Sequence, residues 1–99
     1  MSDEFLIKRF EMGITHADFL RVFRMLVAPE EVTMSGLTLA TVWTPDRCLT
    51  VVLSAQRLRT IAGLSLPSLD ARLQFSSWPE GAVESFMKRF DRAFQQGGG

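Results

Sequence analysis

The stretch from Trp78 to Gln96 limits the folds open to this chain more than any other part, because its apolar residues recur with the period of an α-helix. On such a helix they form one stripe about 120° wide. The stripe consists of Val83, Phe86, Met87, Phe90, Ala93 and Phe94. Charged residues such as Lys88 and Arg89 fill the opposite side. A helix with a single apolar stripe must bury it against a second layer, so we expect a sheet beneath this one.

A second, shorter helix is predicted over residues 16–27. Thr15 can cap its first turn, and Asp18 suits the positive end of the helix dipole. Its apolar residues also share one side, namely Phe19, Val22, Phe23, Leu26 and Val27. Ala28–Pro29 ends it, because the residue before a proline is disfavoured in the α conformation.

Alternating apolar residues predict the sheet, with strands over residues 5–12, 32–43, 48–53, 57–66 and 69–75. Two of these strands have open boundaries. The alternation changes face after Ile7, which indicates a bulge or an early end of the first strand. Gly36 is either a bulge within one strand or a turn between two.

The run over residues 57–66 has an alternative as well. Residues 56–62 would fit a short helical turn, but Gly63 and the β-branched pair Thr60–Ile61 favour a strand. We then expect Pro67 to break the chain before the last strand.

The predicted fold is α+β with the order β-α-β4-α, an antiparallel sheet and both helices on one of its faces. This order resembles the TATA-binding-protein-like and helix-grip groups of folds, a likeness that implies no particular activity. Residues 1–96 are expected to form a single domain, followed by a flexible glycine tail over residues 97–99.

Composition restricts the setting of this domain. The 99 residues, 46% of them hydrophobic, suffice for one core, and Cys48 has no second cysteine for an intramolecular disulfide. The 11 basic and 11 acidic side chains cancel, so a partner recognised through charge must meet a local patch. Residues 1–10 lack the apolar core of a signal peptide, and no apolar run approaches the roughly 20 residues of a membrane span. We expect a cytoplasmic protein that does not contact membranes.

Three segments resemble a group of small, uncharacterised bacterial proteins. They are Gly13–Phe19 at the entry to the first helix, Arg59–Ala62 with Leu64–Pro67, and Phe90–Gly99 at the end of the chain. The resemblance covers most of the chain. It implies one small domain and supplies no catalytic residue.

The residues with the greatest chemical reactivity stand alone in the sequence. His16 is the only histidine, and no second histidine or cysteine near it can complete a familiar metal-ligand set. Cys48 has only Arg47 beside it to activate its thiol. We interpret them as a partly buried histidine near a helix cap and an ordinary thiol, and we expect neither enzymatic activity nor a cofactor.

Arginines form the first candidate site, since nine of the 11 basic residues are arginine. Arg57, Arg59 and Arg72 are predicted on the sheet face away from the helices, and we place Arg47 at a turn nearby. Guanidinium groups suit phosphate or carboxylate ligands. The alternative is a solvated face on which Asp70 balances the charge. Few aromatic residues are interleaved with the arginines, so we do not expect a nucleic-acid surface.

Apolar residues on the same face form the second candidate site. This face carries more of them than contact with water favours, namely Ala40, Val42, Val52 and Ile61. A homodimer would cover both copies of the surface at once. The leading hypothesis is therefore a non-enzymatic interaction or accessory domain that self-associates, and its rival is a protein that binds a small anion through the arginines.

The terminal Gly97–Gly98–Gly99 suggests a third hypothesis. Sulfur carriers of the ubiquitin-like class end in two glycines, which enter an activating enzyme as a slim tail. In those domains a strand precedes the tail, whereas here a long helix is predicted. The simpler interpretation is a helix that stops at a glycine.

Overall fold

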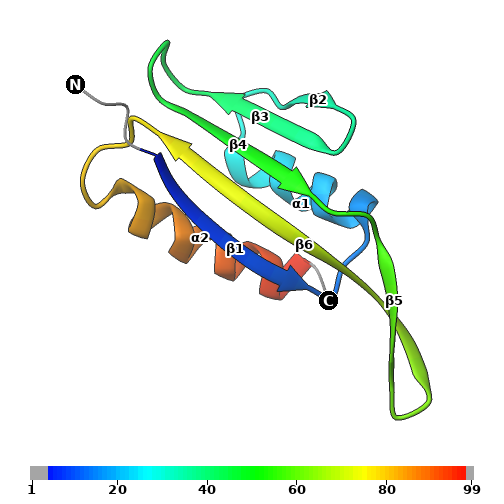
Figure 1. Ribbon diagram of the computed structural model, residues 1–99. Coiled ribbons are helices and arrows are strands. Elements are labelled where there is room, and N and C mark those ends of the chain that lie inside the picture. Colours follow the sequence, from blue (N-terminus) through cyan, green and yellow to red (C-terminus); the bar gives the residue numbers. More distant parts are fainter. Residues whose placement is uncertain (1–4, 98–99) are drawn as a thin grey trace.

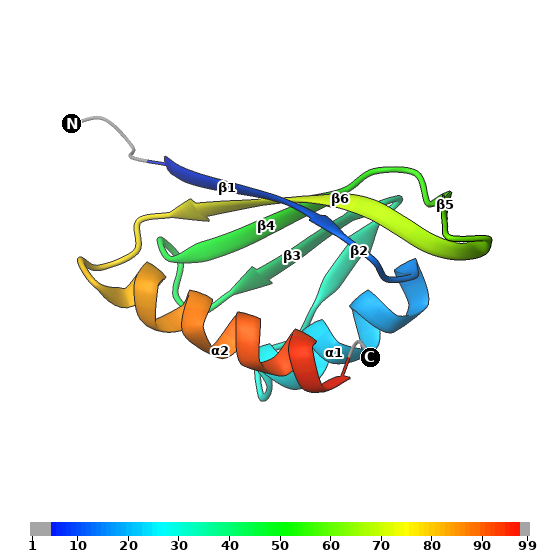
Figure 2. The same ribbon diagram turned by 90° about the horizontal axis from the view of Figure 1, so that it is seen from below.

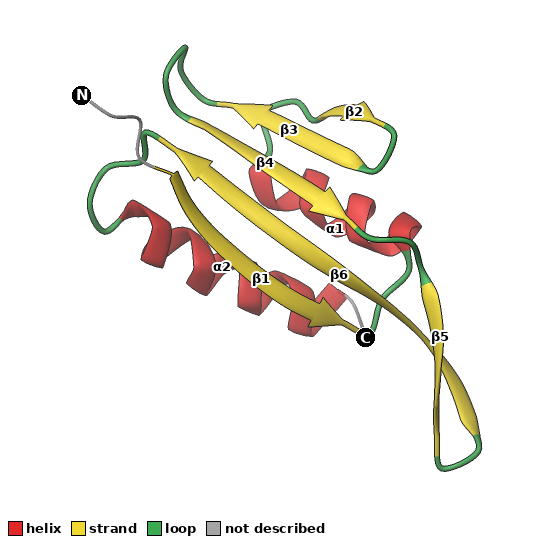
Figure 3. Ribbon diagram, in the orientation of Figure 1, coloured by secondary structure: helices red, strands yellow, loops and turns green. Residues whose placement is uncertain are grey.

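Two helices lie on one face of a six-stranded antiparallel sheet in the computed structural model, which describes residues 5–97 (Figure 1, Figure 2). The elements are β1 (Phe5–Met12), α1 (His16–Val27), β2 (Thr33–Ser35), β3 (Thr38–Val42), β4 (Cys48–Leu53), β5 (Arg57–Ile61), β6 (Leu64–Ser76) and α2 (Ala82–Gly97). The α+β class is confirmed (Figure 3). The observed order is β-α-β5-α, with one more strand after α1 than expected.

The extra strand arises at Gly36, which is a turn rather than a bulge. Its φ is 60°, and with Leu37 it forms a two-residue connection between Ser35 and Thr38, which pair across β2 and β3. The sheet order is β1-β6-β4-β3-β2, so β2 and β1 are its two edge strands.

β1 contains no bulge. It pairs with β6 in unbroken register, from Phe5 opposite Ser76 to Met12 opposite Leu69, so the predicted bulge or early end after Ile7 is wrong. The apolar pattern changes because Ile7 lies on the side of the sheet away from the helices, which we call the outer face. Phe10 and Met12 face the helices and pack against the core.

β6 joins the sheet to a projecting hairpin. It is 13 residues long, and its C-terminal part pairs with β1 on one side and β4 on the other. Its first five residues pair only with β5. Residues 57–68 form a two-stranded hairpin that extends beyond both helices, and we call it the arm (Figure 1). The molecule measures 51 × 24 × 22 Å, with the arm at one end of the long axis.

The arm corrects the prediction of one strand over residues 57–66. Ala62 and Gly63 have φ angles of 52° and 83° and form a tight turn between β5 and β6. Pro67 does not break the chain but lies within β6, opposite Leu58. It is tolerated there because β1 ends opposite Leu69, so β6 has a partner on only one side at this proline.

The core lies between the sheet and the two helices, and the predicted stripes of both helices are confirmed. Phe19 and Phe23 of α1 are fully buried, and Phe86 and Phe90 of α2 are 4% and 2% exposed. They meet the helix-facing side chains of β4 and β6, which are Leu49, Val51, Leu53, Leu69, Ala71, Leu73 and Phe75.

Local interactions fix both ends of α1. Thr15 Oγ1 accepts a hydrogen bond from the backbone N–H of Asp18 at 3.1 Å, which confirms the predicted cap. At the other end, Arg89 of α2 donates from Nη2 to the carbonyl oxygen of Leu26 at 2.9 Å. This arginine was expected to point into solvent, but it ties the two helices together.

Candidate functional site: the outer face and the arm

The arm exposes large apolar side chains. Leu58 is 74% exposed, Ile61 54%, Leu64 64% and Leu66 44%. The cross-strand register places Ile61 beside Leu64 on the side of the arm that continues the outer face, with Leu66 next along β6. Leu58 and Pro67 share the opposite side. An isolated two-stranded hairpin is only marginally stable in water. A partner that covers these apolar side chains would therefore stabilise the arm.

A second apolar area lies at the other end of the outer face. Ala40, Val42 and Val52, predicted as interface residues, all lie on the outer face of β3 and β4, where Val42 is opposite Cys48, Ala40 opposite Thr50 and Val52 opposite Thr38. Ile7 of β1 lies level with Ala40, on the far side of Gln74 and Thr50, and is 40% exposed, and Val42 is 56% exposed. We call Ile7, Ala40, Val42 and Val52 the apolar end. The fourth predicted residue, Ile61, is not part of it but lies at the tip of the arm.

A charged band lies between the tip of the arm and Ile7, Ala40 and Val42 of the apolar end; Val52 borders this band, opposite Arg72, and two of its arginines belong to the base of the arm. It consists of Arg9, Glu11, Arg57, Arg59, Asp70 and Arg72. Arg59 Nη1 donates to Glu11 Oε2 at 2.6 Å, and Arg57 Nη2 donates to Asp70 Oδ1 at 3.3 Å. Ser68 Oγ also donates to Glu11 Oε2, at 3.3 Å. Two of the predicted anion-binding arginines are thus already engaged by carboxylates of the same chain.

These contacts shift the protonation equilibria of the band. The hydrogen bond from Arg59, followed by the charge of the same arginine, lowers the pKa of Glu11. The hydrogen bond to Asp70 raises the pKa of Arg57. The ion pairs are therefore formed at neutral pH, although they lie in solvent, where such pairs contribute little to stability.

Arg9 and Arg72 remain without a carboxylate partner among residues 5–97. They are directly opposite each other on β1 and β6, and like charges in this position repel. With Glu11 and Asp70 they line an open hollow of about 420 Å³ on the outer face. Sequence reasoning missed Arg9 and Glu11, because no local pattern shows which strand lies beside β6.

Arg47 does not lie near these arginines. It precedes β4, whereas Arg57 follows it, and a six-residue strand spans about 20 Å. Its guanidinium carbon lies 4.3 Å from the ring centroid of Trp78 and 5.6 Å from that of Trp43. The predicted proximity of Arg47 to the patch is therefore wrong, since the residue packs against both tryptophans.

His16 and Cys48 occupy separate positions. The Nε2 atom of His16 lies 2.8 Å from the carbonyl oxygen of Ser54, and its backbone N–H donates to Gln56 Oε1 at 2.9 Å, so the residue links α1 to the base of the arm. Cys48 lies half-buried on the outer face, opposite Ser76. Within residues 5–97, no three His, Cys, Asp or Glu side chains form a group that could hold a metal ion.

The C-terminal tail is largely outside the described residues. α2 continues to Gly97, and Gly98 and Gly99 lie beyond the part of the chain that the structure describes. The element before the tail is thus a helix, unlike the strand of the sulfur carriers. Neither α1 nor α2, the two helices found within residues 5–97, is long and apolar enough to cross a membrane.

Comparison of the chain with protein-family models, with curated proteins and with solved structures finds no match. The resemblance to a group of small bacterial proteins and the likeness to the TATA-binding-protein-like and helix-grip folds therefore stay predictions. Function has to be argued from the surfaces described above.

Proposed function

We propose that this protein is a non-enzymatic interaction domain that self-associates through its outer face and its arm. The observation that carries the proposal is the arm, which presents Ile61, Leu64 and Leu66 on the side of the outer face at 44 to 64% exposure, while Leu58 is exposed on its other side. Large exposed apolar patches usually mark sites of protein association. The apolar end offers a second surface of the same kind on the same face.

The layout of β6 suggests how two copies fit together. Its 13 residues run from the arm to the level of the apolar end, with Asp70 at the midpoint. Consider a two-fold axis that is parallel to the plane of the sheet, perpendicular to β6 and above Asp70. It turns the second copy end for end, so the arm of each copy lies over the apolar end of the other. The interface is then isologous, as in most homodimers.

The area of the outer face permits this arrangement, and its charge makes the association depend on salt. A face about 51 Å by 24 Å is large enough to bury the roughly 800 Å² per partner of a stable interface. The charged band, however, has four arginines and two carboxylates, so two bands that face each other repel. We therefore expect association to strengthen as salt screens this repulsion.

Sedimentation velocity over a range of protein concentrations tests the proposal. The parent protein should shift from monomer to dimer as concentration rises, and more completely in high salt. Val42→Glu and Leu64→Glu should both remain monomeric under those conditions. Met25→Glu is the matched control, because Met25 is 70% exposed on α1, away from the outer face. A parent that stays monomeric, or a Met25→Glu variant that dissociates equally, would contradict self-association through this face.

A second candidate function is the binding of a small anion, favoured by the opposed Arg9 and Arg72. Phosphate or a carboxylate placed between their guanidinium groups would relieve the repulsion and accept paired hydrogen bonds. Added phosphate should then raise the melting temperature of the parent protein but not that of Arg72→Gln. Arg92→Gln, which alters an exposed arginine of α2, is the control. An equal effect of phosphate on all three proteins would exclude this site.

A further inference from the structure

β1 is an edge strand whose outward side is unpaired. It is the last strand in the sheet order, and within residues 5–97 no strand or loop forms backbone hydrogen bonds to that side. A row of free N–H and C=O groups is a template for another strand. At eight residues, β1 is also the longer of the two edges, since β2 has three.

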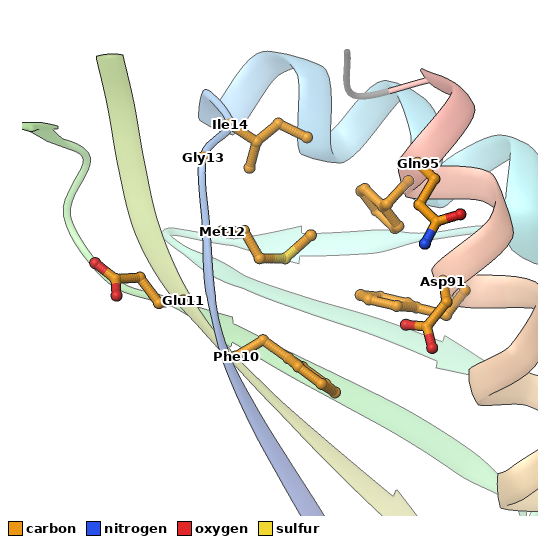
Figure 4. Close-up of a pocket in the computed structure, with 9 residues that line it drawn as sticks. Phe10, Glu11, Met12, Gly13, Ile14, Asp91 and Gln95 are labelled. Atoms are coloured by element: carbon orange, nitrogen blue, oxygen red, sulfur yellow. The ribbon is translucent and has the colours of Figure 1, made fainter. Parts of the chain in front are cut away.

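Two hollows lie between this edge and α2. One, of about 280 Å³, is lined by Phe10, Met12 and Ile14 on one wall and by Phe90, Asp91, Phe94 and Gln95 of α2 on the other. In Figure 4, Phe10 and Met12 point toward α2, Asp91 and Gln95 lie on the opposite wall, and Glu11 points away. The second hollow, of about 520 Å³, includes Leu6 at the start of β1 and Val83 at the start of α2.

The hollows lie at the two ends of one strand, and their spacing suits an extended chain. Leu6, Phe10 and Met12 are on the helix-facing side of β1, and Leu6 is 46% exposed. Side chains of an added strand alternate between two faces. Every second residue of such a strand would therefore enter the groove between β1 and α2.

The charges along the groove define the ligand further. All charged residues that line the two hollows are acidic, namely Glu11 and Asp91 at one and Glu80 and Glu84 at the other, but the side chain of Glu11 points away from its hollow. Glu11 is engaged by Arg59, whereas Asp91 forms no ion pair within residues 5–97. The one basic residue on the helix-facing side of β1 is Lys8, between the hollows. A peptide that carries a basic side chain at its end near Asp91 complements this groove.

We propose that β1 binds an extended segment of a partner protein by strand addition, with alternate apolar side chains of that segment in the groove and a basic side chain opposite Asp91. Backbone hydrogen bonds to β1 supply affinity and the groove supplies selectivity, as in other cases of strand addition. This surface is separate from the outer face and does not depend on self-association.

Selection from a library of random dodecapeptides displayed on phage tests the proposal. The enriched peptides should alternate apolar residues and carry lysine or arginine near one end. One enriched peptide, synthesised with a fluorescent label, should lose about fivefold in affinity for Asp91→Lys by fluorescence anisotropy. Asp46→Lys, which reverses an exposed charge in the loop before β4, should bind as the parent does.

N-methylation of the same peptide separates strand addition from simple burial of apolar groups. Only alternate amides of an added strand donate to β1. Methylation of one alternate set should therefore weaken binding about tenfold or more per group, while methylation of the other set has little effect. This comparison requires no change in the protein, so it is independent of folding defects.

Three results would overturn the proposal. The first is failure to enrich any peptide, and the second is equal tolerance of both methylated sets. The third concerns the protein without peptide. If protection of the β1 amides from hydrogen exchange increases with protein concentration, a second copy of this chain occupies the edge.

Discussion

Replacement of Phe90 by alanine should lower the free energy of unfolding by about 3 to 5 kcal/mol. The side chain is 2% exposed and lies where α2 meets α1 and β1. Its ring centroid is 5.7 Å from that of Phe10, 6.4 Å from Phe19 and 4.5 Å from Phe94. These rings come from three different elements, so they cannot easily move together to fill the space. The loss is at least about a fifth of the roughly 5 to 15 kcal/mol that stabilises a typical domain.

Urea denaturation followed by far-ultraviolet circular dichroism measures this loss, and the melting temperature should fall by roughly 15 °C or more. The slope of free energy against urea should stay unchanged, because the variant exposes a similar surface on unfolding. Lys88→Ala, at an exposed position of the same helix, should change stability by less than about 0.5 kcal/mol. If Phe90→Ala lies within about 1 kcal/mol of the parent, the packing of α2 described above is wrong.

Three further changes test single interactions. Glu11 has a folded pKa below its unfolded value of about 4.3, so its ion pair stabilises the fold above that pH and is lost as pH falls through the folded pKa. Melting temperatures measured from pH 7 downward should therefore fall more steeply below about pH 4 for the parent than for Glu11→Gln. Thr15→Ala removes the α1 cap and should cost about 1 kcal/mol in urea denaturation; an unchanged midpoint would refute the role of the cap. Arg89→Ala removes the hydrogen bond to Leu26 and should cost about 1 kcal/mol by the same assay, whereas Arg92→Ala should cost much less.

The helices and their caps could be predicted because the information for them is local. The apolar stripe of α2, the cap at Thr15 and the stop at Ala28–Pro29 each depend on residues within a few positions of one another. The alternation of β4 and the C-terminal half of β6 is equally short-range. These parts of the sequence were sufficient to predict the α+β class.

The charged band could not be predicted in full, because it depends on which strands pair. Glu11 meets Arg59 only because β1 and the arm both adjoin β6, and these residues are 48 positions apart in the chain. The turn at Ala62 was missed for a different reason. Alanine rarely adopts a positive φ, so it gave no signal of a hairpin.

The position of Arg47 could have been predicted better. A strand over residues 48–53 was expected, and its length alone separates Arg47 from Arg57 by about 20 Å. The groove beside β1, in contrast, requires knowledge of the sheet order. Only the position of β1 at the edge leaves Leu6 and Phe10 facing a space that α2 does not fill.

The packing of Arg47 against Trp43 and Trp78 has a spectroscopic consequence. The chain has two tryptophans and no tyrosine, so nearly all near-ultraviolet absorbance and intrinsic fluorescence arises at this one corner. The two indole centroids are 5.0 Å apart at 74°, close enough for their electronic transitions to couple. The near-ultraviolet and fluorescence signals therefore report the β3–β4 loop and the entry to α2. The arm, at the far end of the long axis, contributes no tryptophan signal. Comparison of the fluorescence midpoint with that of the backbone signal would reveal whether this corner opens together with the remainder of the fold.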